Sequence, residues 1–309
     1  MTNDDGARRP AGQARAGGRM SADDDAARRP AGQARAGGRV ENLDAARRIA
    51  DGVFWLGGCL SAFSAGEEVH YHVSSYLVVG SRASLLVDTG DPAHRALVLD
   101  QLEAALGGRT LDYVFPTHPE IPHAGNLPAL LERFPEARVV GDVRDYALHF
   151  PEFEGRFDAR RPGDSIDLGG REFRFLPAHI RDLENTVWGH DSGARMLFVS
   201  DGFSFIHDVP LPDGDDDEPV HRPGQCRLFS GEMPAPPSVE QAAYGTGRAL
   251  YWTKFVDVST AFAEIERMLA ELPTELIGPA HGNVIDDVGG MLATSLAAHR
   301  RVYDDARKQ

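Results

Sequence analysis

The hydrophobic positions of this chain change period along its length, and the change separates expected strands from expected helices. Short runs rich in Val, Ile, Leu and Phe, bounded by glycine, proline or aspartate, predict strands. These runs cover residues 52–56, 76–79, 83–87, 111–115, 139–140, 166–168, 173–176, 186–188, 196–199 and 276–278. Apolar residues at helical spacing predict helices over residues 93–106, 127–134, 145–150, 239–251, 259–272 and 290–303. Strands and helices interleaved in this way indicate a mixed α/β domain.

The first part of the chain lacks this pattern. Residues 7–19 read ARRPAGQARAGGR, and residues 27–39 repeat them letter for letter. Because this segment has almost no large apolar side chains, we expect residues 1–45 to be a disordered, repeated leader. The folded domain is expected to span residues 46–309. It is interrupted at about residues 203–237, where prolines and an acidic run predict an irregular insertion, either a lid or a disordered loop.

Composition narrows the classes of function. The formal net charge is −15 and no basic stripe occurs outside the leader, so nucleic acids and membranes are poor candidate partners. Cys59 and Cys226 show no CxxC spacing, which argues against a disulfide framework and against a thiolate zinc site. No apolar run is long enough to span a membrane, and the N-terminus lacks the apolar segment of a signal peptide. We therefore expect a cytoplasmic protein.

Side chains that bind metal ions follow several of the expected strands. Imidazole or carboxylate groups occur just past four strand ends, and the candidates are His118, Glu120, His123, His179, Asp201 and His281. Asp88 ends a fifth run. Any one of these groups could be an ordinary hydrogen-bonding residue in a polar loop. Together, at rigid strand ends that can aim several donor atoms at one point, they favour a metal site.

The order of these motifs resembles that of the metallo-β-lactamase fold. The chain has VDTG at 87–90, HxExxH at 118–123, a distant His179, Asp-Gly at 201–202 and PAHG at 279–282. The resemblance implies an αββα four-layer sandwich with a dinuclear metal site at one edge of its two sheets.

Glu120 points to one branch of that fold. The usual hydrolase motif has histidine at this position, whereas a glutamate resembles the oxygen-activating diiron branch, which includes flavodiiron proteins and diiron hydroxylases. A carboxylate in place of an imidazole adds negative charge and a hard oxygen donor, which favours iron. The motif's usual aspartate is Pro122 here, and proline offers no donor atom.

The resemblance also implies a set of ligands for two iron ions. One ion would take His118, Glu120 and His179, and the other would take His123 and His281. Asp201 would bridge the two ions, and Asp88 would orient a ligand histidine. His207 could replace the ligand lost at Pro122, or it could be an ordinary loop histidine.

These features lead to a main functional expectation and two alternatives. We expect a nonheme diiron monooxygenase that uses O2 to hydroxylate a small organic substrate of specialised metabolism. Because no flavodoxin-like segment is evident before Gln309, a separate reductase would supply electrons. The first alternative is a zinc-dependent hydrolase of an ester, thioester or lactone. The second is a diiron protein that reduces O2 or NO, or that binds O2.

Overall fold

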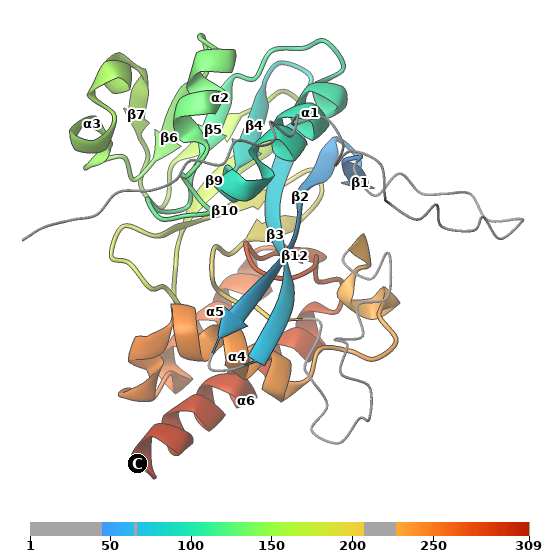
Figure 1. Cartoon of the computed structure of the whole chain (residues 1–309), viewed down its shortest axis with the longest axis vertical. Coiled ribbons are helices and arrows are strands. Elements are labelled where there is room, and N and C mark those ends of the chain that lie inside the picture. Colours follow the sequence, from blue (N-terminus) through green and yellow to red (C-terminus); the bar gives the residue numbers. More distant parts are fainter. Residues whose placement is uncertain (1–44, 65–66, 207–226, 309) are drawn as a thin grey trace, which may run out of the picture. The chain divides into compact units, whose positions relative to one another are not determined.

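A computed structural model of the chain describes residues 45–64, 67–206 and 227–308 (Figure 1). By its contacts the chain divides into residues 1–41 and 42–309, and the second unit holds both sheets and all the helices of the described residues. The expected leader and most of the expected insertion, including His207, lie outside the described residues.

The first sheet has seven strands, which pair in chain order. They are β1 (Arg47–Ala50), β2 (Val53–Ser64), β3 (Glu67–Val79), β4 (Ser84–Val87), β5 (Tyr113–Phe115), β6 (Arg138–Gly141) and β7 (Phe157–Ala159). The pairs from β1 to β4 are antiparallel, whereas β4, β5, β6 and β7 run parallel. In the register of β4 and β5, Val87 lies opposite Phe115, so these two strands end side by side.

The second sheet has five strands in the order β12-β11-β10-β9-β8. They are β8 (Ser165–Asp167), β9 (Glu172–Pro177), β10 (Val187–Asp191), β11 (Met196–Phe198) and β12 (Leu276–Gly278). The pair β11 and β12 is parallel, with Phe198 opposite Gly278, and the other pairs are antiparallel.

Helices cover the outer face of each sheet (Figure 1). The α-helices are α1 (Arg95–Leu106), α2 (Leu127–Arg133), α3 (Tyr146–His149), α4 (Val239–Ala249), α5 (Ser259–Glu271) and α6 (Val288–Arg307). The short 3₁₀ helices are η1 (Pro92–His94), η2 (Pro151–Arg156), η4 (Ser230–Glu232) and η5 (Tyr251–Lys254). Among the described residues, no helix has the length and apolar character needed to cross a membrane.

Three apolar clusters correspond to the three interfaces between these layers. The first sheet packs on α1 and α2 in a cluster that includes Leu86 of β4, Leu102 of α1 and Leu130 of α2. The second sheet packs on α4, α5 and α6 in a cluster that includes Trp188 of β10 and Phe262 of α5. The third cluster lies between the sheets. The αββα sandwich expected from the sequence is therefore confirmed.

Aromatic residues fill the interface between the sheets. The ring of Phe115 in β5 lies 5.7 Å from that of Phe173 and 5.0 Å from that of Phe175, both in β9. Gly189 in β10 makes room for them, because a Cβ atom there would lie 2.4 Å from Cζ of Phe173. Close packing of this kind fixes the separation of the sheets and so the spacing of the strand ends that carry the candidate ligands.

The sequence underestimated two strands and missed two others. β2 and β3 run well beyond the expected residues 52–56 and 76–79. Their outer parts include Gly57, Gly58 and His72, which interrupt the hydrophobic pattern. β1 and β7 lie at the two edges of the first sheet, where charged residues such as Arg47 and Asp158 are common and weaken the strand signal.

His299 on α6 should make the stability of the domain depend on pH. The side chain is buried beside Phe262, and burial lowers its pKa to about 4. Because the unfolded chain binds this proton near pH 6.5, stability is full above that pH and is lost as pH falls toward 4. The loss is about 1.4 kcal/mol per pH unit over this range, on the order of 3 kcal/mol in total.

Urea unfolding of wild type and of His299→Leu at pH 7.5 and pH 5 tests this expectation. The variant should lose less stability than the wild type between the two pH values, because leucine binds no proton. Equal losses in the two proteins would contradict it.

Candidate metal centre

The carboxyl ends of four strands supply the side chains of this site. Asp88 follows β4, His118 follows β5, Asp201 follows β11 and His281 follows β12. β4 and β5 are parallel neighbours in one sheet, and β11 and β12 are parallel neighbours in the other. The four ends therefore meet at one edge of the sandwich, which is where open α/β sheets commonly bind ligands.

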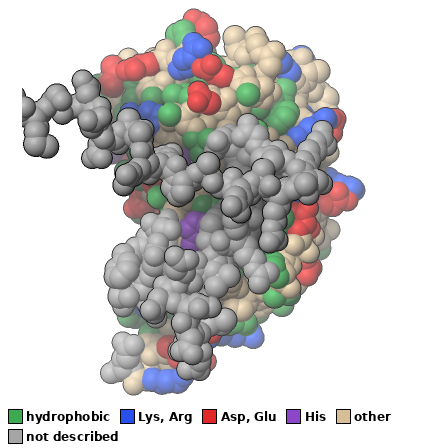
Figure 2. Space-filling model, turned by 45° about the vertical axis from the view of Figure 1, so that its right-hand side comes forward, with side chains coloured by type: hydrophobic (Ala, Val, Ile, Leu, Met, Phe, Trp, Pro, Cys, Tyr) green, Lys and Arg blue, Asp and Glu red, His purple; other side chains and the backbone are tan. Residues whose placement is uncertain are grey.

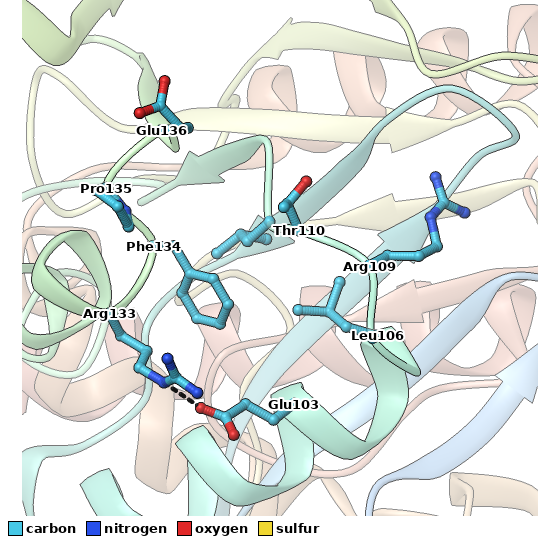
Figure 3. Close-up of a pocket in the computed structure, with 10 residues that line it drawn as sticks. Glu103, Leu106, Arg109, Thr110, Arg133, Phe134, Pro135 and Glu136 are labelled. Atoms are coloured by element: carbon cyan, nitrogen blue, oxygen red, sulfur yellow. Dashed lines mark hydrogen bonds and ion pairs between the residues drawn. The ribbon is translucent and has the colours of Figure 1, made fainter.

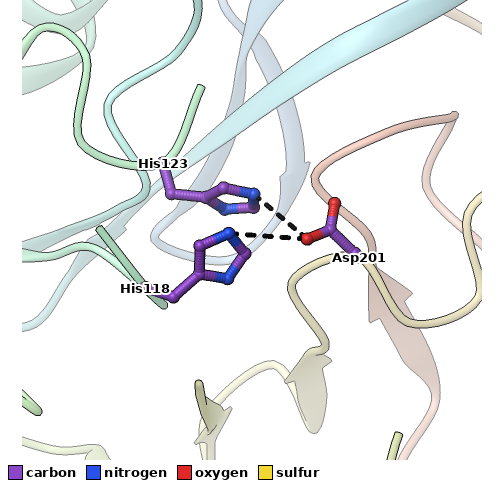
Figure 4. A group of neighbouring side chains, drawn as sticks. All are labelled: His118, His123 and Asp201. Atoms are coloured by element: carbon purple, nitrogen blue, oxygen red, sulfur yellow. Dashed lines mark ion pairs between the residues drawn. The ribbon is translucent and has the colours of Figure 1, made fainter. Parts of the chain in front are cut away.

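Asp201 lies at the centre of three imidazoles. Its Oδ2 is 3.5 Å from Nε2 of His118 and 3.4 Å from Nε2 of His123. Its Oδ1 is 3.0 Å from Nε2 of His281. Figure 4 shows His118 and His123 directed toward the carboxylate from the opposite side of the site. The structure thus brings together four residues that the sequence indicated.

The loop of His281 is held by the middle of β3. The backbone N–H of Ser74 donates to the carbonyl of Ala280 (2.9 Å), and that of Gly282 donates to the carbonyl of His72 (2.8 Å). Gly282 has φ of +115°, a conformation that other residues rarely adopt. The unexpected length of β3 is therefore part of how His281 is positioned.

Asp88 and two hydroxyl groups hold the other nitrogens of His118 and His123. Nδ1 of His123 lies 3.0 Å from Asp88 Oδ2. Nδ1 of His118 lies 3.0 Å from Ser200 Oγ, and Ser200 Oγ lies 2.9 Å from Thr117 Oγ1. Thr117 also donates to Asp88 Oδ1 through its backbone N–H (2.8 Å) and its hydroxyl (2.9 Å).

The carboxylate of Asp88 sets the direction of these hydrogen bonds. A carboxylate only accepts, so the single hydroxyl proton of Thr117 goes to Asp88, and Thr117 then accepts from Ser200. Ser200 in turn accepts from Nδ1–H of His118, while Nδ1–H of His123 donates directly to Asp88. Both rings therefore carry a proton on Nδ1 and direct Nε2 at Asp201.

This arrangement suits a bound metal ion. Nε2 of His118 is buried and has no hydrogen-bond partner among the described residues, an unfavourable state for a polar atom unless it binds a ligand. Metal-binding histidines commonly donate their other N–H to a carboxylate or another acceptor, as His123 does to Asp88. The donor set of imidazole and carboxylate fits a transition metal such as iron or zinc.

Two of the residues that support the histidines have strained backbones. Asp88 has φ of +56° and Ser200 has φ of +53°, in the left-handed region that favours glycine. Such strain persists only where the surrounding structure imposes it, and it occurs often at functional sites. In this centre it places the Asp88 carboxylate and the Ser200 hydroxyl against the two rings.

The protonation of the cluster reflects burial and close charges. Burial, with a contribution from His123, lowers the pKa of His118 to about 2. Burial works against a charge on His123 also, but Asp88 and Asp201 outweigh it and raise the pKa of His123 well above its usual value. Burial opposes a charge on Asp201, yet His123 and His281 hold the pKa of that carboxyl well below its usual range. The cluster thus favours positive charge beside Asp201, which a metal ion would supply.

A second group of ligand atoms shares His118. His118, Glu120 and Asp182 each place a nitrogen or carboxylate oxygen so that all three lie within 4.8 Å of one another. Asp182 was not indicated by the sequence. It lies in the irregular segment between β9 and β10, where no strand end and no motif marks it.

The other candidates lie as follows. His179 is not in either group of ligand atoms; its ring lies 6.3 Å from that of Trp188. Pro122 is buried within the ligand loop, beside His123. His207 lies outside the described residues, so its proposed part as an extra ligand stays a prediction.

The centre reaches solvent on the side of Glu120 and His281. Glu120 is exposed, and the side chain of His281 is 26% exposed, whereas His118 and His123 are buried. Figure 2 shows histidine at the surface of this view of the molecule. A small molecule could therefore approach the centre from this side.

A separate cavity of about 440 Å³ lies at the other end of the first sheet (Figure 3). It is lined by residues that precede β5 and β6, including Thr110 and Glu136, and by the ion pair of Arg133 with Glu103. Because it contains none of the metal-binding candidates, it has no part in the metal centre.

The substitution Thr117→Val tests whether the hydroxyl network of Thr117 and Ser200 contributes to metal binding. The valine removes the link between Ser200 and Asp88, so we expect metal affinity to fall about 10–100-fold, the usual effect of losing a group that orients a ligand. Thr253→Val is the matched control, since Thr253 is also buried and donates one hydrogen bond, to the Leu250 carbonyl. Chelator competition with Fe²⁺ measures both variants, and equal affinities in the two would contradict the expected role of Thr117.

Comparison with known proteins identifies a family that this chain resembles. The family model described as the metallo-beta-lactamase superfamily matches residues 70–225. The coenzyme F420H(2) oxidase of Methanothermobacter thermautotrophicus is 32% identical over 171 residues, which are 50% of this chain and 41% of that protein. The anaerobic nitric oxide reductase flavorubredoxin of Vibrio vulnificus is 27% identical over 216 residues, 68% of this chain and 40% of that protein. This chain spans less than half the length of these curated relatives.

Solved structures share the fold. The flavodiiron protein from Giardia intestinalis has a TM-score of 0.63 at 16% identity, over 84% of this chain and 59% of that one. A fragment (1–254) of putative diflavin flavoprotein A 5 from Nostoc sp. PCC 7120 has a TM-score of 0.61 at 16% identity. That match covers 85% of this chain and 96% of the fragment. At such identities the likeness concerns the fold alone.

Proposed function

Because the chain belongs to the metallo-beta-lactamase superfamily, we propose that it is a diiron oxidoreductase that reduces dioxygen or nitric oxide. The observation that carries the proposal is the donor set around Asp201. Three imidazoles contact this one carboxylate, and two further carboxylates, Glu120 and Asp182, lie beside His118. A set so rich in hard oxygen donors favours iron over zinc.

The relatives support reduction over hydroxylation. Hydroxylation of an organic substrate was the main expectation from the sequence, and reduction of O2 or NO was an alternative. The relatives named above are an oxidase and a nitric oxide reductase, and the neighbouring structures include a flavodiiron protein. We therefore adopt the alternative as the proposed reaction.

The zinc hydrolase is the less favoured candidate. In hydrolases of this fold the residue at the position of Pro122 is an aspartate, and the residue at the position of Glu120 is a histidine. Proline provides no atom to bind a metal or to orient an attacking water, and glutamate changes the charge of the site.

The residues of the chain would act by holding and shielding the metal ions. His123, His281 and Asp201 would hold one ion, and His118 and Glu120 would hold the other together with Asp201. Bound iron would supply the electrons that reduce O2 or NO. The Asp88–Thr117–Ser200 network keeps the Nε2 atoms of His118 and His123 in place, and Pro122 leaves fewer protein donors on the side of His123. Electrons would come from a separate donor protein or from a further domain.

Gas consumption by the iron-loaded protein tests this proposal. With a chemical reductant and a redox mediator, O2 or NO should be consumed without any organic substrate, and the zinc-loaded protein should be inactive. If consumption needed an organic compound that gained an oxygen atom from labelled O2, hydroxylation would replace reduction. If the zinc-loaded protein cleaves an ester or lactone without a reductant, the zinc hydrolase becomes the favoured function.

A further inference from the structure

We propose that Asp182, rather than His179, completes the protein ligands of the metal ion that His118 and Glu120 hold. The inference rests on the proposed function in requiring a metal at this centre. It concerns which side chains bind the metal and is independent of the reaction that follows.

The positions of three side chains support this assignment. His118, Glu120 and Asp182 place one ligand atom each within 4.8 Å of the others. The imidazole of His118 is wholly buried, and its Nε2 is without a hydrogen-bond partner in the described part of the chain. Asp201 lies on the Nε2 side of this ring, and Asp182 lies on its Nδ1 side. A buried nitrogen with no hydrogen-bond partner, on a ring flanked by carboxylates, is the pattern expected where a cation binds.

A hydrogen bond to His118 does not explain why the Asp182 carboxylate lies beside this ring. Asp182 Oδ1 lies 3.6 Å from His118 Nδ1, which is too far for a hydrogen bond, and that nitrogen already contacts Ser200 Oγ at 3.0 Å. Instead the hydroxyl of Thr186 donates to Asp182 Oδ1 at 3.2 Å. Carboxylates that bind metals are commonly held by such a hydrogen bond.

The negative charge of the carboxylates in this centre also favours the binding of a cation close to Asp182. Asp88, Asp182 and Asp201 each lie against an imidazole, and in the described residues none of the three pairs with Lys or Arg. Asp182 lies 3.6 Å from one nitrogen of His118 and Asp201 lies 3.5 Å from the other, so two largely buried carboxyl groups come close together at this ring. Buried carboxylates so placed are stabilised by a metal ion.

His179 faces a different part of the fold. Its ring packs edge-on against Trp188, which belongs to the cluster between the second sheet and the helices. Burial lowers the pKa of His179, and the charged groups that influence it are Glu264 and Arg267 of α5 and Arg181. The histidine is thus directed to the helical layer, whereas Asp182, only three residues later, lies beside His118.

Metal content of matched variants tests the proposal. The wild type, Asp182→Ala, Asp182→His and His179→Ala are loaded with Fe²⁺ without oxygen, and with Co²⁺ separately, and freed of excess metal. Ions per chain and the visible absorption of bound Co²⁺ are then measured, with circular dichroism as the check on folding.

We expect Asp182→Ala to hold one ion fewer per chain than the wild type, and His179→Ala to hold as many as the wild type. Asp182→His should recover the ion with a changed Co²⁺ spectrum, because imidazole replaces carboxylate. Loss of an ion from His179→Ala would overturn the proposal, as would an unchanged metal content in Asp182→Ala. If Asp182→Ala does not fold, an unchanged Co²⁺ spectrum in Asp182→His overturns it. If the wild type binds iron but reduces neither O2 nor NO, the proposed function is contradicted and the assignment of Asp182 as a ligand is unaffected.

Discussion

Asp201→Asn is expected to lower the reduction of O2 or NO by more than about 100-fold, since losing even a group that only orients a ligand costs about 10–100-fold. Asp201 contacts His118 of one proposed metal position and His123 and His281 of the other, so its carboxylate would serve both positions. An amide has nearly the same shape but carries no charge and is a much weaker ligand. Both metal ions should therefore bind less tightly, and metal analysis alongside the activity assay should show the loss.

Asp112→Asn is the matched control for this substitution. Asp112 precedes β5, at the end of the strand opposite the metal centre, and its Oδ2 accepts hydrogen bonds from Ser84. This variant should be somewhat less stable but should keep its metal and its activity per folded protein. A wild-type metal content in Asp201→Asn would show that Asp201 is not the bridge.

Phe175→Ala is expected to destabilise the domain by about 3–5 kcal/mol, the usual cost of truncating a buried phenylalanine. Phe175 is fully buried between the sheets, 5.0 Å from the Phe115 ring and 5.6 Å from the Phe173 ring. Its removal leaves a cavity at the interface that sets the distance between the two sheets.

Urea unfolding compares this variant with Phe255→Ala. Phe255 is 74% exposed, so its truncation should change the free energy of unfolding by less than about 0.5 kcal/mol. Similar losses in the two variants would mean that the interface between the sheets is not the main core of the domain.

The sequence revealed the parts of the centre that follow regular strands. His118, His123, Asp201 and His281 each come shortly after a run of apolar residues, and the structure brings all four together. A strand end fixes the direction of the side chains that follow it, so residue type and position were enough to find them. Asp88, at the end of β4, lies against His123 for the same reason.

The remainder could not be read from the sequence because it depends on irregular backbone. The segment from Ala178 to Thr186 has no hydrophobic period, so nothing indicated that Asp182 lies near His118 and that His179 lies near Trp188. The outer parts of β2 and β3 were missed because pairing with each other, and not a hydrophobic pattern, holds them as strands. The hydrogen-bond chain through Thr117 and Ser200 likewise depends on the left-handed backbone at Ser200.

The measurement that tests the central claim most directly is the metal content of the purified protein, with a Mössbauer spectrum of the iron-loaded form. We expect two irons per chain that are magnetically coupled, because Asp201 lies between the two sets of ligands and would bridge the ions. Two zinc ions that iron cannot replace would contradict the claim and favour hydrolysis.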